Sequence, residues 1–325
     1  MEINYLHKKD LESLQGLLNG FEFNYYKIYS PEEHLADRQL FRSIKGLFSK
    51  GAKAIAARDN SSIIGLAVLI DLPWETKYFG FKMAEIKYLI VKDGLKDACG
   101  IKNYLLSFIQ DIGRKEKIGH VSSKVHAGDF SGIRALEEGG FSLMGNQLTY
   151  LLNLKTYRMP VFKEVCRVRP FKKRDLKELM ELAQKFPPQE TRFAIDEHLP
   201  SQKRKNAYYA EWILNSARDK FSDMLIVAER NNKIVGFISC SLNKELKQAF
   251  GINCLHQGLI IVSPEAKGSS LSLLKYVATH RGSNFKAGLF EFITYMHNFP
   301  MIRVFQKLGF PLVRAQYCFS KRLNN

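Results

Sequence analysis

The stretch GLIIVSPEAKGSS, residues 258–270, joins the end of a predicted strand to the start of a predicted helix. Its apolar first half ends at Val262 and predicts a buried strand, which Pro264 then terminates. The small residues 268–270 predict the start of a helix whose backbone N–H groups are exposed. Such a turn is a candidate anion site, because unpaired N–H donors and the helix dipole both attract negative charge. An ordinary strand-to-helix turn capped by serine would use the same residues.

Outward from this stretch, similar segments occur twice along the chain in the same order. In the first pair of segments, a short strand is followed by an Asp that begins a helix. The second pair is predicted to be a β-hairpin. The third pair begins a helix, and a Gly-Phe dipeptide comes after that helix. The pairs are LHKKDL (6–11) with FKKRDL (171–176), IAARDNSSIIG (55–65) with IVAERNNKIVG (226–236), and DFSGIR (129–134) with NFPMIR (298–303). Three ordered matches predict two copies of one fold.

Each copy is predicted to be an α/β domain with a mixed sheet and helices on both faces. The sequence YRMP (157–160) interrupts all patterns, so we expect domains at 1–156 and 164–325. In the second copy the patterns predict strands near 165–170, 224–230, 234–241, 252–262, 287–295 and 311–320. They predict helices near 174–186, 203–218, 268–280 and 298–308.

Composition excludes several classes of protein. Apolar residues make up 46% of the 325, enough for two cores and too many for a disordered chain. No apolar run approaches the roughly 18 residues that a membrane span needs. The N-terminus lacks a signal-peptide pattern, and five scattered cysteines favour reduced thiols in a cytoplasmic protein without a metal site.

The net charge of +17 is concentrated in the second half. Residues 161–325 carry 27 Lys and Arg against 14 Asp and Glu, a net of +13, whereas residues 1–160 carry 22 against 18, a net of +4. A basic half predicts an anionic partner, such as a phosphorylated cofactor, a nucleotide-linked substrate, nucleic acid or an anionic membrane surface. Nucleic acid is disfavoured, because the basic clusters 172–174 and 203–205 begin predicted helices and lack adjacent base-stacking aromatic residues.

The order of strand, basic glycine turn, helix, strand and Asn-initiated helix resembles the GNAT superfamily of acyl-CoA-dependent N-acetyltransferases, once in each half. The resemblance implies acetyl-CoA as the cofactor, with its pyrophosphate on the turn that begins at Lys267. This turn keeps the family's cation and replaces both motif glycines with serine, whereas the turn at 96–101 sets Asp97 beside its cation and lacks a correctly placed glycine. We therefore expect the second copy to bind the cofactor through Leu259, Ile260, Ile261, Val262, Lys267, Gly268, Ser269, Ser270, Leu271, Ser272, Asn298 and Phe305.

Two aromatic segments narrow the resemblance to nucleotide-amino-sugar acetyltransferases of the TDP-fucosamine type. LPWETKYFGF (72–81) and ETRFAID (190–196) look like the acceptor-side segments of those enzymes. The first copy would then help to build the acceptor cleft, although an aromatic core with a glycine turn would give the same pattern. The implied acceptor contacts are Trp74, Tyr78, Phe79, Arg192, Phe193 and Asp196.

The family fold implies direct transfer to an amine, with a backbone N–H of Leu259 or Ile260 meeting the developing oxyanion. His256, Glu291 and His297 are candidate bases, although each could simply pack or be solvated. The family's acid is a Tyr on the last helix, and that position holds Phe305 in the second copy and Leu136 in the first. Tyr295 and Tyr317 are the candidate substitutes.

These features predict an acetyl-CoA-dependent N-acetyltransferase acting on a small amine, for example a nucleotide-linked amino sugar. Two alternatives keep the tandem fold. One is a non-catalytic module that binds CoA or a partner, which Phe305 favours. The other is an aminoacyl-tRNA-dependent ligase, which the basic half suits but which usually carries a helical insertion that has no obvious place here.

Overall fold

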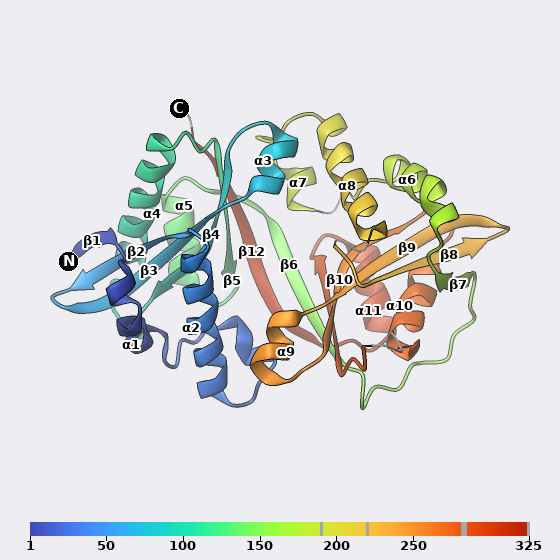
Figure 1. Cartoon of the computed structure of the whole chain (residues 1–325), viewed down its shortest axis with the longest axis horizontal. Helices are drawn as coiled ribbons and strands as arrows, with labels where there is room; N and C mark the ends of the chain where they lie inside the picture. Colours follow the sequence, from blue (N-terminus) through green and yellow to red (C-terminus); the bar gives the residue numbers. More distant parts are fainter. Residues whose placement is uncertain (189–190, 219–220, 281–284, 324–325) are drawn as a thin grey trace. The chain divides into compact units, whose positions relative to one another are not determined.

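The computed structural model describes residues 1–188, 191–218, 221–280 and 285–323 (Figure 1). The chain forms two compact units, one of residues 1–146 with 315–325 and the other of residues 147–314. We call them unit 1 and unit 2. Each contains a mixed sheet with helices packed on it, as the sequence predicts.

Unit 1 contains six strands in the order β1-β2-β3-β4-β5-β12. Pairing is antiparallel except between β4 and β5, which run parallel. Short 3-10 turns cover Lys8–Asp10, Glu12–Leu14 and Tyr25–Ile28. The strands are β1 (Glu2–Tyr5), β2 (Lys53–Asp59), β3 (Ser62–Asp71), β4 (Met83–Val91), β5 (His120–His126) and β12 (Leu312–Arg322), and the helices are α1 (Gln15–Leu18), α2 (Glu33–Ser49), α3 (Pro73–Phe79), α4 (Ala98–Lys115) and α5 (Phe130–Glu138).

Unit 2 repeats this plan in the order β6-β11-β10-β9-β8-β7, again with one parallel pair, β10 and β11. A 3-10 turn covers Lys173–Asp175. The strands are β6 (Ser142–Asn153), β7 (Arg167–Pro170), β8 (Met224–Arg230), β9 (Lys233–Leu242), β10 (Cys254–Val262) and β11 (Leu289–Tyr295), and the helices are α6 (Leu176–Lys185), α7 (Arg192–Ile195), α8 (Gln202–Ala217), α9 (Lys244–Phe250), α10 (Ser269–His280) and α11 (Phe299–Lys307).

The division of the chain differs from the expected boundary within 154–163. The final strand, β12, pairs with β5 of unit 1, and Gln147–Asn153 of β6 pair with β11 of unit 2. Each sheet is therefore completed by the strand that follows the other unit's last helix. Sequence patterns predict that these segments are strands, but they do not specify the pairing partner, because a strand's hydrophobic alternation is the same in either sheet.

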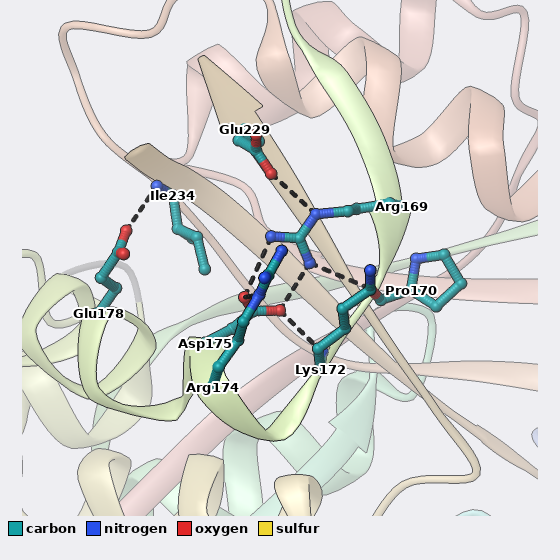
Figure 2. A network of polar contacts seen from close by, with 8 residues as sticks. All are labelled: Arg169, Pro170, Lys172, Arg174, Asp175, Glu178, Glu229 and Ile234. Carbon is teal, nitrogen blue, oxygen red and sulfur yellow. Dashed lines mark hydrogen bonds and ion pairs between the residues drawn. The ribbon is translucent and has the colours of Figure 1, made fainter. Parts of the chain in front are cut away.

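The repeated Asp at the start of each unit makes the same local structure twice. Asp10 and Asp175 each accept a hydrogen bond from the backbone N–H three residues earlier, which caps a 3-10 turn. Asp175 also binds Arg169, whose guanidinium nitrogens lie 2.6 and 3.0 Å from its two carboxylate oxygens and 2.8 Å from Glu229 (Figure 2). In unit 1, Arg58 lies 3.0 Å from Asp10.

One face of the unit 1 sheet packs on α4 and α5. The core cluster includes Ile55, Ile86 and Val121 from the strands, Leu105 from α4 and Leu136 from α5. Phe319 and Leu323, from the end of the chain, complete this cluster. Among the described helices, none is both long and apolar enough to cross a bilayer.

Candidate functional site

The parallel strands of unit 2 pair over only a short length. Cys254 pairs with Leu289, Leu255 with Phe290, and His256 with Glu291, and the register ends there although both strands continue. Beyond this point β10 carries a bulge opposite β9, between Gln257 and Ile260. Bulges locally bend a strand and often lie beside functional sites. The end of the β10–β11 register is therefore the centre of the candidate site.

Two of the three candidate bases meet at this point. Nδ1 of His256 lies 3.4 Å from Oε1 of Glu291, and their Cα positions are directly paired across the strands. The Glu291 side chain is completely buried, whereas the His256 side chain is 35% exposed. His297 lies after the end of β11, where its ring centroid is 5.7 Å from that of Tyr295. A partly exposed imidazole beside a buried carboxylate is a suitable arrangement for proton transfer.

At the bulge, one of the two backbone N–H groups expected to bind the oxyanion already donates a hydrogen bond within the protein. The N–H of Leu259 donates to Oγ of Ser239 at 2.9 Å. Gly258 fits here because a Cβ at that position would come within 2.6 Å of the same hydroxyl oxygen. With the Leu259 donor bonded inside the protein, Ile260 is the remaining candidate among the residues expected to meet an oxyanion.

The N-terminus of α10 contains two buried hydroxyl groups with unused hydrogen-bonding capacity. Oγ of Ser269 and Oγ of Ser272 have no hydrogen-bond partner within the part of the chain that the structure describes, and their residues are 0% and 3% exposed. Gly268 precedes them with a φ of +91°, a conformation that favours glycine. Lys267 is exposed beside this turn. Buried hydroxyls, helix N–H groups and a cation together fit a phosphate group.

The corresponding N-terminus in unit 1 is already filled by the protein's own acids. The Asp97 side chain caps α4 and accepts from the N–H of Gly100 at 3.1 Å. One turn further, Nζ of Lys102 lies 2.6 and 2.7 Å from the two carboxylate oxygens of Asp129, and both residues are buried. An anion at this helix would meet a carboxylate, so α4 is a poor phosphate site.

The two acid positions lie in the cores. Phe305 is completely buried, and its ring centroid lies 4.6 Å from Tyr150, 5.4 Å from Phe292 and 5.7 Å from Phe310. Leu136 is equally buried in the core of unit 1. Sequence reasoning did not single out Tyr150, because it lies on β6 and reaches unit 2 only through the exchange of strands. Burial raises the pKa of the Tyr150 phenol.

The two candidate substitutes for the acid lie in different units. Tyr295 is buried at the end of β11 in unit 2. Tyr317 lies on β12, pairs with Val125 and packs against the core of unit 1. Tyr317 thus belongs to unit 1, because the last strand pairs with β5 of that unit and not with the sheet of the expected domain 164–325.

The remaining residues expected to contact the cofactor lie on the strand and helices that the sequence predicts. Asn298 caps α11, where its side chain accepts from the N–H of Met301 at 3.2 Å, and Asp129 caps α5 in the same way. Ile260, Ile261 and Val262 continue β10 past the bulge, and Ser270 and Leu271 lie in the first turn of α10.

The expected acceptor contacts fall on two elements in two units. In unit 1, Trp74, Tyr78 and Phe79 lie on α3, where the Trp74 and Tyr78 rings are 4.8 Å apart and Phe79 is completely buried. In unit 2, Arg192 and Phe193 lie on α7, with the guanidinium 4.8 Å from the phenyl centroid.

Asp196 follows α7 and is buried, and it accepts from the N–H of His198 at 3.0 Å. Glu190 lies outside the described residues. Phe79 and Asp196 thus have interior positions, whereas the other four expected acceptor contacts are partly exposed.

Known proteins are similar to this chain at two levels: a family model matches part of unit 2, and a curated protein matches most of the chain. Residues 176–310 match the model of the acetyltransferase (GNAT) family. The chain is also similar to the spore coat polysaccharide biosynthesis protein SpsD of Bacillus subtilis, at 23% identity over 296 residues that cover 89% of this chain and 92% of that protein.

Two solved structures share the fold over the full length. One is a GCN5-related N-acetyltransferase from Sphaerobacter thermophilus, with a TM-score of 0.64, 14% identity and coverage of 100% of this chain and 96% of that one. The other is a tandem GNAT protein from the clavulanic acid biosynthesis pathway, with a TM-score of 0.58, 15% identity and coverage of 100% and 99%. The chain therefore has the tandem GNAT fold over its whole length, and its residues 176–310 match the model of the acetyltransferase (GNAT) family.

Proposed function

We propose that the protein is an acetyl-CoA-dependent N-acetyltransferase whose unit 2 binds the cofactor. Its acceptor is a small anionic amine, specifically a nucleotide-linked amino sugar. The similarity to a polysaccharide biosynthesis protein supports a sugar acceptor. The surplus of basic residues in the second half supports an anionic one.

The contrast between α10 and α4 carries this proposal. Ser269 and Ser272 offer buried hydroxyls at the N-terminus of α10, and the pyrophosphate of CoA would accept from them and from Lys267. At α4 the positions equivalent to the two serines hold Ala98 and Ile101, which have no hydroxyl, and Asp97 accepts from the N–H of Gly100. The assignment therefore places one cofactor site in unit 2 and none in unit 1.

His256 is the proposed general base. Glu291 would accept a hydrogen bond from its Nδ1–H, which leaves Nε2 free to take the proton that the acceptor amine must lose. Acetyl-CoA supplies an activated acetyl thioester that a neutral amine can attack. In unit 1 the paired positions hold Glu85 and Ser122, so the imidazole and its buried carboxylate are features of unit 2 alone.

Release of free thiol from acetyl-CoA, measured against a panel of nucleotide-linked amino sugars, tests the proposal. We expect acceptor-dependent release by the wild type, and a rate about 10²–10⁴-fold lower in His256→Ala, because a general base contributes about that much. His280→Ala, at the exposed end of α10, is the control and should leave the rate unchanged.

The alternative of a non-catalytic module rests on Phe305 and Leu136, which put buried apolar side chains at both acid positions. Measurable acetyl-CoA binding without thiol release on any acceptor would support this alternative and contradict the proposed activity.

A further inference from the structure

Gln257 is a buried polar residue at the centre of the candidate site. It directly follows His256, the last residue of β10 in register with β11, and directly precedes the bulge. The residue is only 7% exposed, and its Oε1 has no hydrogen-bond partner among the described residues. A buried carbonyl oxygen without a donor destabilises the folded protein, so its retention calls for an explanation.

The fold itself does not require an amide at this position. In unit 1 the equivalent residue is Ile86. Both residues are the fourth residue of their strand, β4 or β10. Ile86 pairs with Leu69 of β3, and Gln257 pairs with Cys240 at the equivalent position of β9. Ile86 is 1% exposed and packs in the apolar cluster with residues of α4 and α5. The unit without a cofactor site therefore fills this position with a hydrocarbon side chain.

The alternation of the strand determines which ligand can reach Gln257. Consecutive strand residues point to opposite faces, so Gln257 faces away from the side on which His256 meets Glu291. Its face is the one on which Phe292 packs against Phe305 of α11, and the equivalent face in unit 1 is covered by α4 and α5. A donor that reached Gln257 Oε1 would therefore have to approach on the face of α10 and α11, and an amine at His256 would lie on the other face.

We propose that Gln257 Oε1 accepts a hydrogen bond from an amide N–H of the pantetheine arm of the cofactor. This assignment rests on the proposed function, which places the pyrophosphate at α10 on the same face. The pantetheine arm has two amide N–H donors, whereas the adenosine and phosphate part of CoA binds elsewhere in this arrangement. Gln257 is thus a residue that positions the pantetheine arm. Without the ligand, its Oε1 has no hydrogen-bond donor among the described residues, and this lowers the stability of the ligand-free protein.

Substitution by the residue that unit 1 uses tests this assignment with two readouts. In Gln257→Ile, the melting temperature of the ligand-free protein should rise by about 2–4 °C, because the orphaned carbonyl is removed. In calorimetry, its affinity for acetyl-CoA should fall about 3- to 10-fold. Its affinity for adenosine 3′,5′-bisphosphate, which lacks the arm, should be unchanged. Gln257→Met, of similar length and without the carbonyl, should behave in the same way.

Ile86→Gln is the matched control, since it puts the amide into the unit without a cofactor site. It should lower the melting temperature and leave acetyl-CoA affinity unchanged. Equal acetyl-CoA affinity in wild type, Gln257→Ile and Gln257→Met would overturn the assignment and indicate an internal water as the partner of Oε1. If the wild type binds the bisphosphate but the Gln257 variants lose it as well, the assignment to the arm is wrong. A wild type that binds neither ligand contradicts the proposed function itself, and the assignment to the arm with it.

Discussion

At the scale of single residues, Asp175 shows how a repeated sequence signal becomes a buried contact. Burial alone would raise the pKa of its carboxyl, but the hydrogen bonds from Arg169 and from the N–H of Lys172 outweigh burial and lower it (Figure 2). A lowered folded-state pKa means that this stabilisation is complete above the unfolded-state pKa of about 4 and is lost as the pH falls toward the folded-state value. The network thus ties the start of α6 to β7 in neutral solution.

We expect Asp175→Asn to lower the free energy of unfolding by about 1–3 kcal/mol at pH 7, because Arg169 loses a charged partner but keeps Glu229. Urea unfolding at a series of pH values measures this. The difference from wild type should begin to shrink as the pH falls through about 4, where the Asp175 carboxylate of the unfolded wild type becomes protonated, and it should vanish only below the lowered folded-state pKa. Glu164→Gln, which breaks the more exposed pair with Lys275, should cost less than about 1 kcal/mol. Equal costs for the two variants would contradict the role assigned to the network.

At the scale of elements, the N-termini of α10 and α4 differ in what satisfies their donors. We expect Lys267→Glu to weaken acetyl-CoA binding by about 1–3 kcal/mol, roughly 5- to 150-fold, because a charge-assisted phosphate contact is inverted. Lys96→Glu makes the same change at the equivalent turn of unit 1 and should leave the affinity unchanged, since Asp97 already occupies that helix end. Calorimetric titration compares the two variants. A larger loss in Lys96→Glu would move the site to unit 1.

At the scale of the whole molecule, the last strand stabilises the first unit. Phe319 and Leu323 belong to the unit 1 core, and the N–H of Leu323 donates to the carbonyl of Gly119 at 3.1 Å. Deletion of residues 312–325 should therefore remove hydrogen-exchange protection from β5, nearly two hundred residues earlier, while β11 keeps its partner β6. Phe319→Ala should destabilise unit 1 by about 3–5 kcal/mol without truncation. Loss of protection confined to β11 would contradict the exchange.

The duplicated order of elements can be predicted from the sequence alone. Its signals are local: alternating apolar residues for strands, helical periodicity, and capping residues such as Asp10, Asp175 and Asn298 act within a few positions of one another. They locate the turn that begins at Lys267 and name His256 and Glu291 as separate candidates. They also predict that unit 1 is the weaker cofactor site, because Asp97 stands beside the cation of its turn.

Which segments pair and which side chains meet could not be predicted from the sequence and is seen in the folded chain. The pairing of β12 with β5 puts Tyr317 in unit 1, and the pairing of β6 with β11 brings Tyr150 against Phe305. The contact of His256 with Glu291 and the unmatched oxygen of Gln257 depend on register between strands, which joins residues far apart in the chain. Hydrophobic alternation predicts that a segment is a strand and which of its faces is buried. It does not predict the neighbouring strand, because that pairing depends on side-chain contacts between segments far apart in the chain, which form only in the folded sheet.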